Sequence, residues 1–287
     1  TDGGGSIRIP ASFCGVFGLK PTFGLVPSLP GFGGWKTLSH VGPIARSVRD
    51  AALMLDVVAG PDEIDRTSIP RGTSSYLRAV ARPRVGLRLG YSPDLGFAAV
   101  EAAVAGVVEG ALGAFETLGH LVDRVALDLG AARPIFEIVV GAENAGAHRT
   151  ELENHRALMD EGLVKFIERG LGVSAVEYVA AVARRDELAA ALAAHFARYD
   201  LLLTPAVAVA PFPVGQAPKD PLDWIPFTYP FNLTGNPAAS VPAGRTSDGL
   251  PVGLQVVGPR HEDGLVLNLA AQFEEAHPWA HLRPPEP

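Results

Sequence analysis

The stretch Thr1-Asp2-Gly3-Gly4-Gly5-Ser6-Ile7-Arg8-Ile9-Pro10 decides how the rest of this chain is interpreted. Glycine has no Cβ atom, so consecutive glycines can turn sharply and bring backbone N–H groups around one point. Converging N–H groups form an oxyanion hole, and the serine that follows them is a candidate nucleophile. The next three residues show a β-like pattern. A continuous patterned run follows the glycines, which argues against a flexible GGGS linker.

Further segments extend this pattern along the chain. Residues 18–22 read GLKPT and Gly24 follows, while residues 231–238, 240–244 and 250–255 read FNLTGNPA, SVPAG and LPVGLQ. Together with residues 1–11, these segments closely resemble the amidase signature family of serine hydrolases. The resemblance covers most of the chain, and residues 85–200 are its least diagnostic part. Asn236 departs from the family, which usually has an apolar residue before Pro-Ala.

The resemblance implies a serine nucleophile and neither a cofactor nor a metal. In the family, the serine at the position of Ser6 attacks an amide carbonyl and becomes acylated. The backbone N–H groups at the positions of Gly3, Gly4, Gly5 and Ser6 line the oxyanion hole. A second serine, behind a non-proline cis peptide bond, bridges the nucleophile to a lysine. That lysine must be neutral, so desolvation must lower its pKa.

In the family, the bridging serine and the lysine both lie ahead of the signature segment. Among the four lysines of this chain, Lys20 belongs to the GLKP turn, and none is a candidate for the catalytic lysine. We therefore expect residues 1–287 to be a single amidase domain that is truncated at its N-terminal side. Because a serine without its base loses several orders of magnitude in rate, we expect this polypeptide alone to be inactive.

Several other side chains are candidates for supporting roles. Asp2 and Arg8 flank the serine among apolar neighbours, so we predict an ion pair that fixes the glycine loop. Thr1 is expected in the same hydrogen-bond network. The family places aromatic loop residues along the cleft for the acyl group, and packing on the core is the alternative for each of them. The candidates here are Trp35, Trp224, Phe227 and Phe231.

Composition restricts the compartment and the partners. The chain has 287 residues, of which 47% are hydrophobic and 19% charged, with a net charge of −7. No basic run is present, so we expect no nucleic-acid partner. The longest apolar stretch, residues 201–214, contains three prolines and is too short for a membrane span. We expect a cytoplasmic protein that acts on a small-molecule amide, and the sequence leaves a homo-oligomer open.

Helical and strand patterns alternate along the chain. Residues 48–59, 98–119, 133–170 with a break near Gly146, 174–199 and 263–276 are predicted helices. Residues 85–89, 121–127, 201–204, 239–242 and 252–257 are predicted strands. Residues 11–34 are expected to form short strands and turns, and 62–80 and 205–236 to form loops. This alternation predicts an α/β fold, and the resemblance implies a mixed central sheet flanked by helices.

Two more features are candidates for sites. The single cysteine, Cys14, lies in an apolar run and is expected to be buried and inert. His148, Glu151 and His155 share one helix face that could ligate a metal, but we find no fourth ligand and expect an ordinary exposed face.

The function that follows is hydrolysis of a small carboxamide, or of an aryl or alkyl amide, to an acid plus ammonia or an amine. One alternative is the A subunit of a tRNA-dependent amidotransferase, which hydrolyses glutamine, although the Tyr-rich motif expected after GLKPT is not found. Another is an inactive truncated copy. A Ser–His–Asp triad is compatible with the eight histidines but would lack the G-x-S-x-G elbow.

Overall fold

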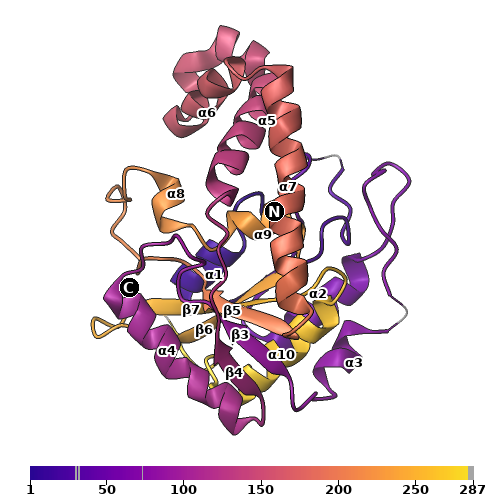
Figure 1. Ribbon diagram of the computed structural model, residues 1–287, viewed down its shortest axis with the longest axis vertical. Helices are drawn as coiled ribbons and strands as arrows, with labels where there is room; N and C mark the ends of the chain where they lie inside the picture. Colours follow the sequence, from indigo (N-terminus) through magenta and orange to yellow (C-terminus); the bar gives the residue numbers. More distant parts are fainter. Residues whose placement is uncertain (30, 32, 73, 284–287) are drawn as a thin grey trace.

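A seven-stranded mixed sheet forms the centre of the computed structural model, which describes residues 1–29, 31, 33–72 and 74–283 (Figure 1). The strands lie in the order β2-β1-β6-β7-β5-β3-β4. Strand β3 runs parallel to β4 and β5, and the other neighbours are antiparallel. The predicted α/β fold with a mixed central sheet is therefore confirmed. The strands are β1 (Phe17–Lys20), β2 (Ile44–Ala45), β3 (Arg88–Tyr91), β4 (Leu121–Arg124), β5 (Leu201–Pro205), β6 (Ala238–Arg245) and β7 (Pro251–Val257).

Helices cover the sheet, and three of them extend well beyond it. In Figure 1, α5, α6 and α7 project upward from the sheet as a helical arm. No helix in the described part of the chain is long and apolar enough to cross a membrane. The helices are α1 (Arg8–Cys14), α2 (Val48–Val58), α3 (Tyr76–Val80), α4 (Ala102–Thr117), α5 (Ala132–His155), α6 (Glu161–Leu171), α7 (Ala175–Phe196), α8 (Pro221–Trp224), α9 (Tyr229–Leu233) and α10 (Asp263–Ala276), with a short 3₁₀ turn at Arg156–Leu158.

The sheet separates two hydrophobic cores. Strand β5 shows the division, because Leu201 and Leu203 pack with residues of α2, α4 and α10, whereas Leu202 packs with residues of α5, α7 and α9. Successive side chains of a strand point to opposite faces, so a strand that is apolar throughout needs a core on both sides. All five residues of β5 are buried. The continuous apolar pattern of this segment thus reflects a central strand.

The β-like prediction for residues 7–9 is wrong, because helix α1 begins at Arg8. The alternation of Ile7, Arg8 and Ile9 does not separate a buried face from an exposed one, since Arg8 is itself fully buried. Pro10 lies in the first turn, where its missing N–H costs no helical hydrogen bond. Gly15, at φ 64°, ends the helix with its N–H directed to the carbonyl groups of the last turn.

Other differences concern loops and boundaries. Residues 205–236 include the short helices α8 and α9, and residues 62–80 end in α3. The strand predicted at 85–89 begins three residues later. Helix α5 has its non-helical residue at His148, close to the predicted break. Residues 30, 32 and 73, which fall in the predicted turn and loop ranges, lie outside the described residues.

Helices α5 and α6 touch through their backbones. Gly170 of α6 lies so close to α5 that a Cβ atom there would stand 1.8 Å from the carbonyl oxygen of Gly141. Backbone atoms cannot move aside as a side chain can, so any larger residue at position 170 must push the helices apart.

We therefore expect Gly170→Ala to lower the free energy of unfolding by about 1–3 kcal/mol, the usual cost of overpacking. The matched control is Gly146→Ala in α5, where a Cβ atom meets nothing within 4 Å. That change should be neutral or stabilising by up to about 1 kcal/mol, because alanine favours a helix more than glycine does. Urea unfolding of both variants measures the difference, and equal effects would contradict the close contact.

Candidate active site

The glycine loop is held in place by the carboxylate of Asp2. This fully buried side chain accepts hydrogen bonds from the backbone N–H of Gly5 at 2.8 Å and of Ile7 at 3.2 Å. The backbone of Asp2 also forms an antiparallel bridge with His40. One carboxylate therefore fixes both the start and the end of the turn that carries Ser6.

Arg8 is the partner of this carboxylate, as predicted. Its two nitrogens Nε and Nη2 donate to Asp2 at 3.0 and 2.8 Å, and both side chains are fully buried. The guanidinium also donates to the side chains of Asn232 at 2.6 Å and Gln255 at 3.0 Å and to the backbone carbonyl of Thr228 at 2.8 Å. Buried charges are tolerated only when they are paired and hydrogen-bonded, and this arrangement meets both conditions.

The second layer of contacts joins the loop to distant parts of the chain. Asn232 on α9 donates to the carboxylate of Asp2 at 2.9 Å. Gln255 on β7 donates to Thr204 at 3.0 Å and to the carbonyl of Phe227 at 2.8 Å. Residues 232 and 255 belong to the family-like segments, but the sequence alone assigns them no role. Only the fold shows that these amides surround Arg8.

Charge and burial act in opposite directions at Asp2. Burial alone raises the pKa of this carboxyl, but the Arg8 guanidinium and the hydrogen bond from Asn232 outweigh it, so the pKa lies well below its usual range. The carboxylate is thus ionised at neutral pH. It acts as a fixed acceptor for the loop.

Close packing explains why the loop consists of glycines. Gly5 has a backbone φ of 138°, which residues other than glycine rarely adopt. A Cβ atom on Gly3 would lie 2.5 Å from the ring of Trp35. A Cβ atom on Gly4 would lie 2.9 Å from Phe136. The backbone at Gly3 and Gly4 therefore contacts the rings of Trp35 and Phe136 directly, and any larger residue at these two positions would collide with them.

The N–H groups of the loop differ in availability. The N–H of Gly5 is engaged with Asp2. Within the residues that the structure describes, the N–H groups of Gly3, Gly4 and Ser6 make no hydrogen bond. The side chain of Ser6 is exposed and likewise has no hydrogen-bond partner among the described residues. Thr1 is also exposed and makes no hydrogen bond within them, so the expectation that it joins the network of Asp2 and Arg8 is not met. The loop thus presents a hydroxyl beside backbone donors that are free for a ligand.

The predicted cleft aromatics divide into two groups. Trp35 lies against Gly3 and packs on Phe136, with ring centroids 6.1 Å apart, and is only partly buried. Phe227 and Phe231 are fully buried in the core, so the expectation that they line a cleft is not met. Trp224 stacks on Phe13 of α1 at 5.9 Å. Of these four rings, Trp35 is the one that a Cβ atom on Gly3 would meet.

Lys20 is a fully buried amine close to this cluster. Its Nζ donates to the backbone carbonyl of Asn236, the residue that departs from the family. Burial lowers the pKa of Lys20 well below its ordinary value, and the positive charge of Arg8 acts in the same direction, whereas Asp2 and Asp263 act against it. The amine thus satisfies a carbonyl at the turn before β6 and has no contact with Ser6.

Two candidates remain from the sequence: the possible metal-binding helix face and the single cysteine. Among the described residues, no group of three His, Cys, Asp or Glu side chains could hold a metal, so His148, Glu151 and His155 do not form a site. Cys14 is exposed, contrary to the prediction of a buried thiol. It is the last residue of α1, where the helix ends at the protein surface.

Comparisons with known proteins agree with this geometry. A family model described as Amidase matches residues 1–267. An acylamidase of Rhodococcus erythropolis is 40% identical over 99% of this chain and 62% of its own length. The A subunit of a glutamyl-tRNA(Gln) amidotransferase from Thermus thermophilus is 38% identical over 99% of this chain and 65% of its own length. The chain therefore spans less than two thirds of the length of these curated relatives.

Solved structures of similar fold include two amide hydrolases. A bacterial aryl acylamidase of the amidase signature enzymes superposes with a TM-score of 0.85 and 30% identity, covering 97% of this chain and 61% of that protein. A 6-aminohexanoate cyclic dimer hydrolase, solved with its substrate, gives a TM-score of 0.87 and 29% identity, covering 98% of this chain and 64% of that protein.

Replacing Arg8 by methionine should be strongly destabilising, because it leaves the buried carboxylate of Asp2 without its partner. We expect Arg8→Met to cost about 3–5 kcal/mol of unfolding free energy. The control is Arg124→Met, which breaks an exposed pair with Glu109 and should cost less than about 1 kcal/mol. Urea unfolding at neutral pH measures both. A similar small loss in each variant would show that the buried pair is not required.

Lys20 should make stability depend on pH. Its pKa is lower in the folded chain than the ordinary value of about 10.4, so the unfolded chain binds more protons and stability rises with pH. As the pH approaches this ordinary value from below, we expect the unfolding free energy to increase by up to about 1.4 kcal/mol per pH unit. Lys20→Met should remove this slope, whereas Lys36→Met, at an exposed position, should keep it. Equal slopes in all three proteins would mean that Lys20 is charged when folded.

Proposed function

The chain belongs to the amidase signature family, and from that membership we propose that the complete protein is an amidase acting through Ser6. It hydrolyses a small carboxamide, or an aryl or alkyl amide, to a carboxylic acid plus ammonia or an amine. The observation that carries the proposal is the exposed Ser6 at the end of a loop fixed by the buried pair of Asp2 and Arg8. The acylamidase relative and the aryl acylamidase structure support this substrate class.

In the proposed reaction, Ser6 Oγ attacks the amide carbonyl carbon while its proton passes to a base. The negative charge on the carbonyl oxygen is stabilised by the free N–H groups of Gly3, Gly4 and Ser6, and such donors are typically worth about 3–4 kcal/mol each. The C–N bond then breaks, and the nitrogen leaves with the transferred proton. Water attacks the resulting ester, which releases the acid and restores the hydroxyl of Ser6.

The proposed base is the serine–lysine pair that the family carries ahead of the glycine loop. Lys20 does not fit this role, because its amine is buried against the carbonyl of Asn236. No cofactor enters the reaction. Gly5 is assigned a structural role, because its N–H already binds Asp2. We also propose that the protein is cytoplasmic and that its substrate is a small molecule.

Trp35 is the proposed contact for the acyl group. Its ring lies on Gly3, next to the free N–H groups, and it retains exposed surface. A flat aromatic wall there favours apolar or aromatic acyl groups. Of the other aromatic candidates, Phe227 and Phe231 are fully buried, and Trp224 stacks on Phe13 of α1.

Removing the nucleophile should abolish turnover. In the full-length gene product we expect Ser6→Ala to lower kcat for 4-nitroacetanilide by at least about a thousandfold with the fold unchanged. The control is Ser247→Ala, an exposed serine in the turn between β6 and β7, which should keep the wild-type rate. Release of 4-nitroaniline gives the rate. Full activity in Ser6→Ala would sink the assignment.

The same preparation separates the amidase from the glutamine-hydrolysing amidotransferase. The relative from Thermus thermophilus supports this second candidate. A glutaminase is expected to release ammonia from glutamine faster than it cleaves an anilide, and an acylamidase the reverse. Glutamine hydrolysis that is lost in Ser6→Ala, together with inert anilides, would favour the amidotransferase.

A further inference from the structure

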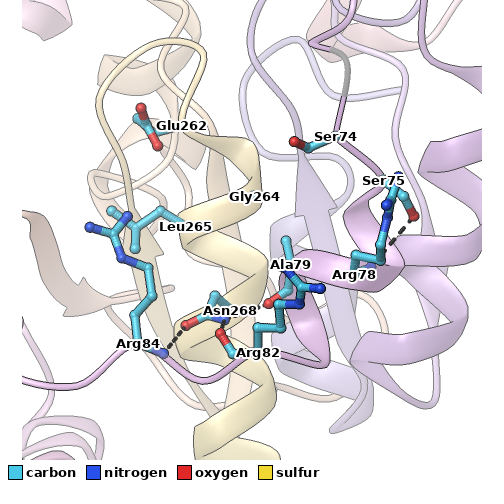
Figure 2. Close-up of a pocket in the computed structure, with 10 residues that line it drawn as sticks. All are labelled: Ser74, Ser75, Arg78, Ala79, Arg82, Arg84, Glu262, Gly264, Leu265 and Asn268. Carbon is cyan, nitrogen blue, oxygen red and sulfur yellow. Dashed lines mark hydrogen bonds between the residues drawn. The ribbon is translucent and has the colours of Figure 1, made fainter.

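A pocket that shares no residue with the glycine loop lies between α3 and α10 (Figure 2). Its volume is about 390 Å³, a size suited to a small organic molecule. The apolar part of its lining is formed by Ala79, Gly264 and Leu265. A Cβ atom on Gly264 would approach only the Cβ of Ala79, at 3.5 Å, so glycine leaves space here without being required by the backbone.

Three arginines line this pocket without an ion-pair partner among the described residues. Arg78, Arg82 and Arg84 are exposed, and within the described residues their guanidinium groups take part in no ion pair or hydrogen bond. The chain as a whole has a net charge of −7, so acidic partners are not scarce. Glu262 lines the same pocket but does not pair with any of the three (Figure 2). The nearby carboxylate of Asp56 is already bound by Ser75 and Arg71.

The backbone that carries these arginines is held rigidly on α10. The side chain of Asn268, only 2% exposed, donates to the carbonyl oxygens of Ala79 and Arg82 and accepts from the N–H of Arg84 at 3.0 Å. Gln272 donates to the carbonyl of Arg84 at 3.1 Å. A buried amide thus fixes the chain on both sides of the turn between α3 and β3. A fixed backbone lowers the entropy lost when a ligand is bound.

We propose that this pocket binds a small organic anion with at least two negative charges, carried by phosphate or carboxylate groups. Guanidinium groups bind both kinds of oxyanion through paired hydrogen bonds. Three of them, on α3 and on the turn that follows it, would bind the charged groups, and the apolar part of the lining would contact the body of the molecule. This site is independent of Ser6 and does not depend on the proposed amidase reaction.

Calorimetric titration of the full-length gene product with pyrophosphate and with citrate, at about 0.15 M salt, tests the proposal. We expect saturable binding of at least one probe. Preference for pyrophosphate would identify a phosphate ligand, and preference for citrate a carboxylate ligand. Replacing all three arginines by glutamine should weaken binding at least about a hundredfold, since each charged contact contributes roughly tenfold. The triple variant is Arg78→Gln, Arg82→Gln and Arg84→Gln.

Two controls distinguish a built site from general attraction to positive charge. A second triple variant removes the same charge from exposed arginines elsewhere and should keep the wild-type affinity; it combines Arg49→Gln, Arg66→Gln and Arg169→Gln. Gly264→Leu keeps every charge but fills the pocket, so it should abolish binding while the melting temperature stays the same or rises. Absence of saturable binding, equal weakening in both triple variants, or unchanged binding in Gly264→Leu would each overturn the proposal.

Discussion

The buried ion pair between Asp2 and Arg8 is the interaction on which the candidate site depends. Asp2 orders the glycine loop, and Arg8 attaches that loop to α9 and β7 through Asn232 and Gln255. A buried pair stabilises a fold little compared with apolar residues of the same size, but removal of either partner is costly. Its value here is positional, because it fixes the backbone turn that carries Ser6.

The sequence allowed the sheet, most helices and the ion pair of Asp2 with Arg8 to be predicted, because periodic apolar patterns and the family-like motifs are local signals. Predictions from the sequence were wrong where a charged residue is buried or a residue with apolar neighbours is exposed. Arg8 looks like an exposed position of a strand but lies in the core, and so the β-like prediction for residues 7–9 is wrong. The prediction for Cys14 is wrong in the opposite sense: its neighbours in the sequence are apolar, but the residue itself lies at the protein surface.

Long-range polar contacts could not be predicted from spacing. Asn232 and Gln255 meet Arg8 only because β6 and β7 return beside β1 and α1. The aromatic residues near position 230 gave no signal that separates a cleft wall from a core. Phe227 and Phe231 are fully buried, whereas Trp35, which is far from them in the sequence, lies against the glycine loop. Deciding between these alternatives required the packing itself.

The pairing of β1 with β6 has a consequence for how the protein is made. Gly18 pairs with Ser240, so β1 waits for a strand that lies 222 residues further along the chain. Contacts of such sequence separation slow folding, because a long loop must close before they form. During synthesis on the ribosome, β2 and His40 follow soon after β1 and the glycine loop, whereas the partners on β6, α9 and β7 emerge much later. One edge of β1 is therefore unpaired while the residues up to β6 are synthesised, which gives chaperones time to bind it.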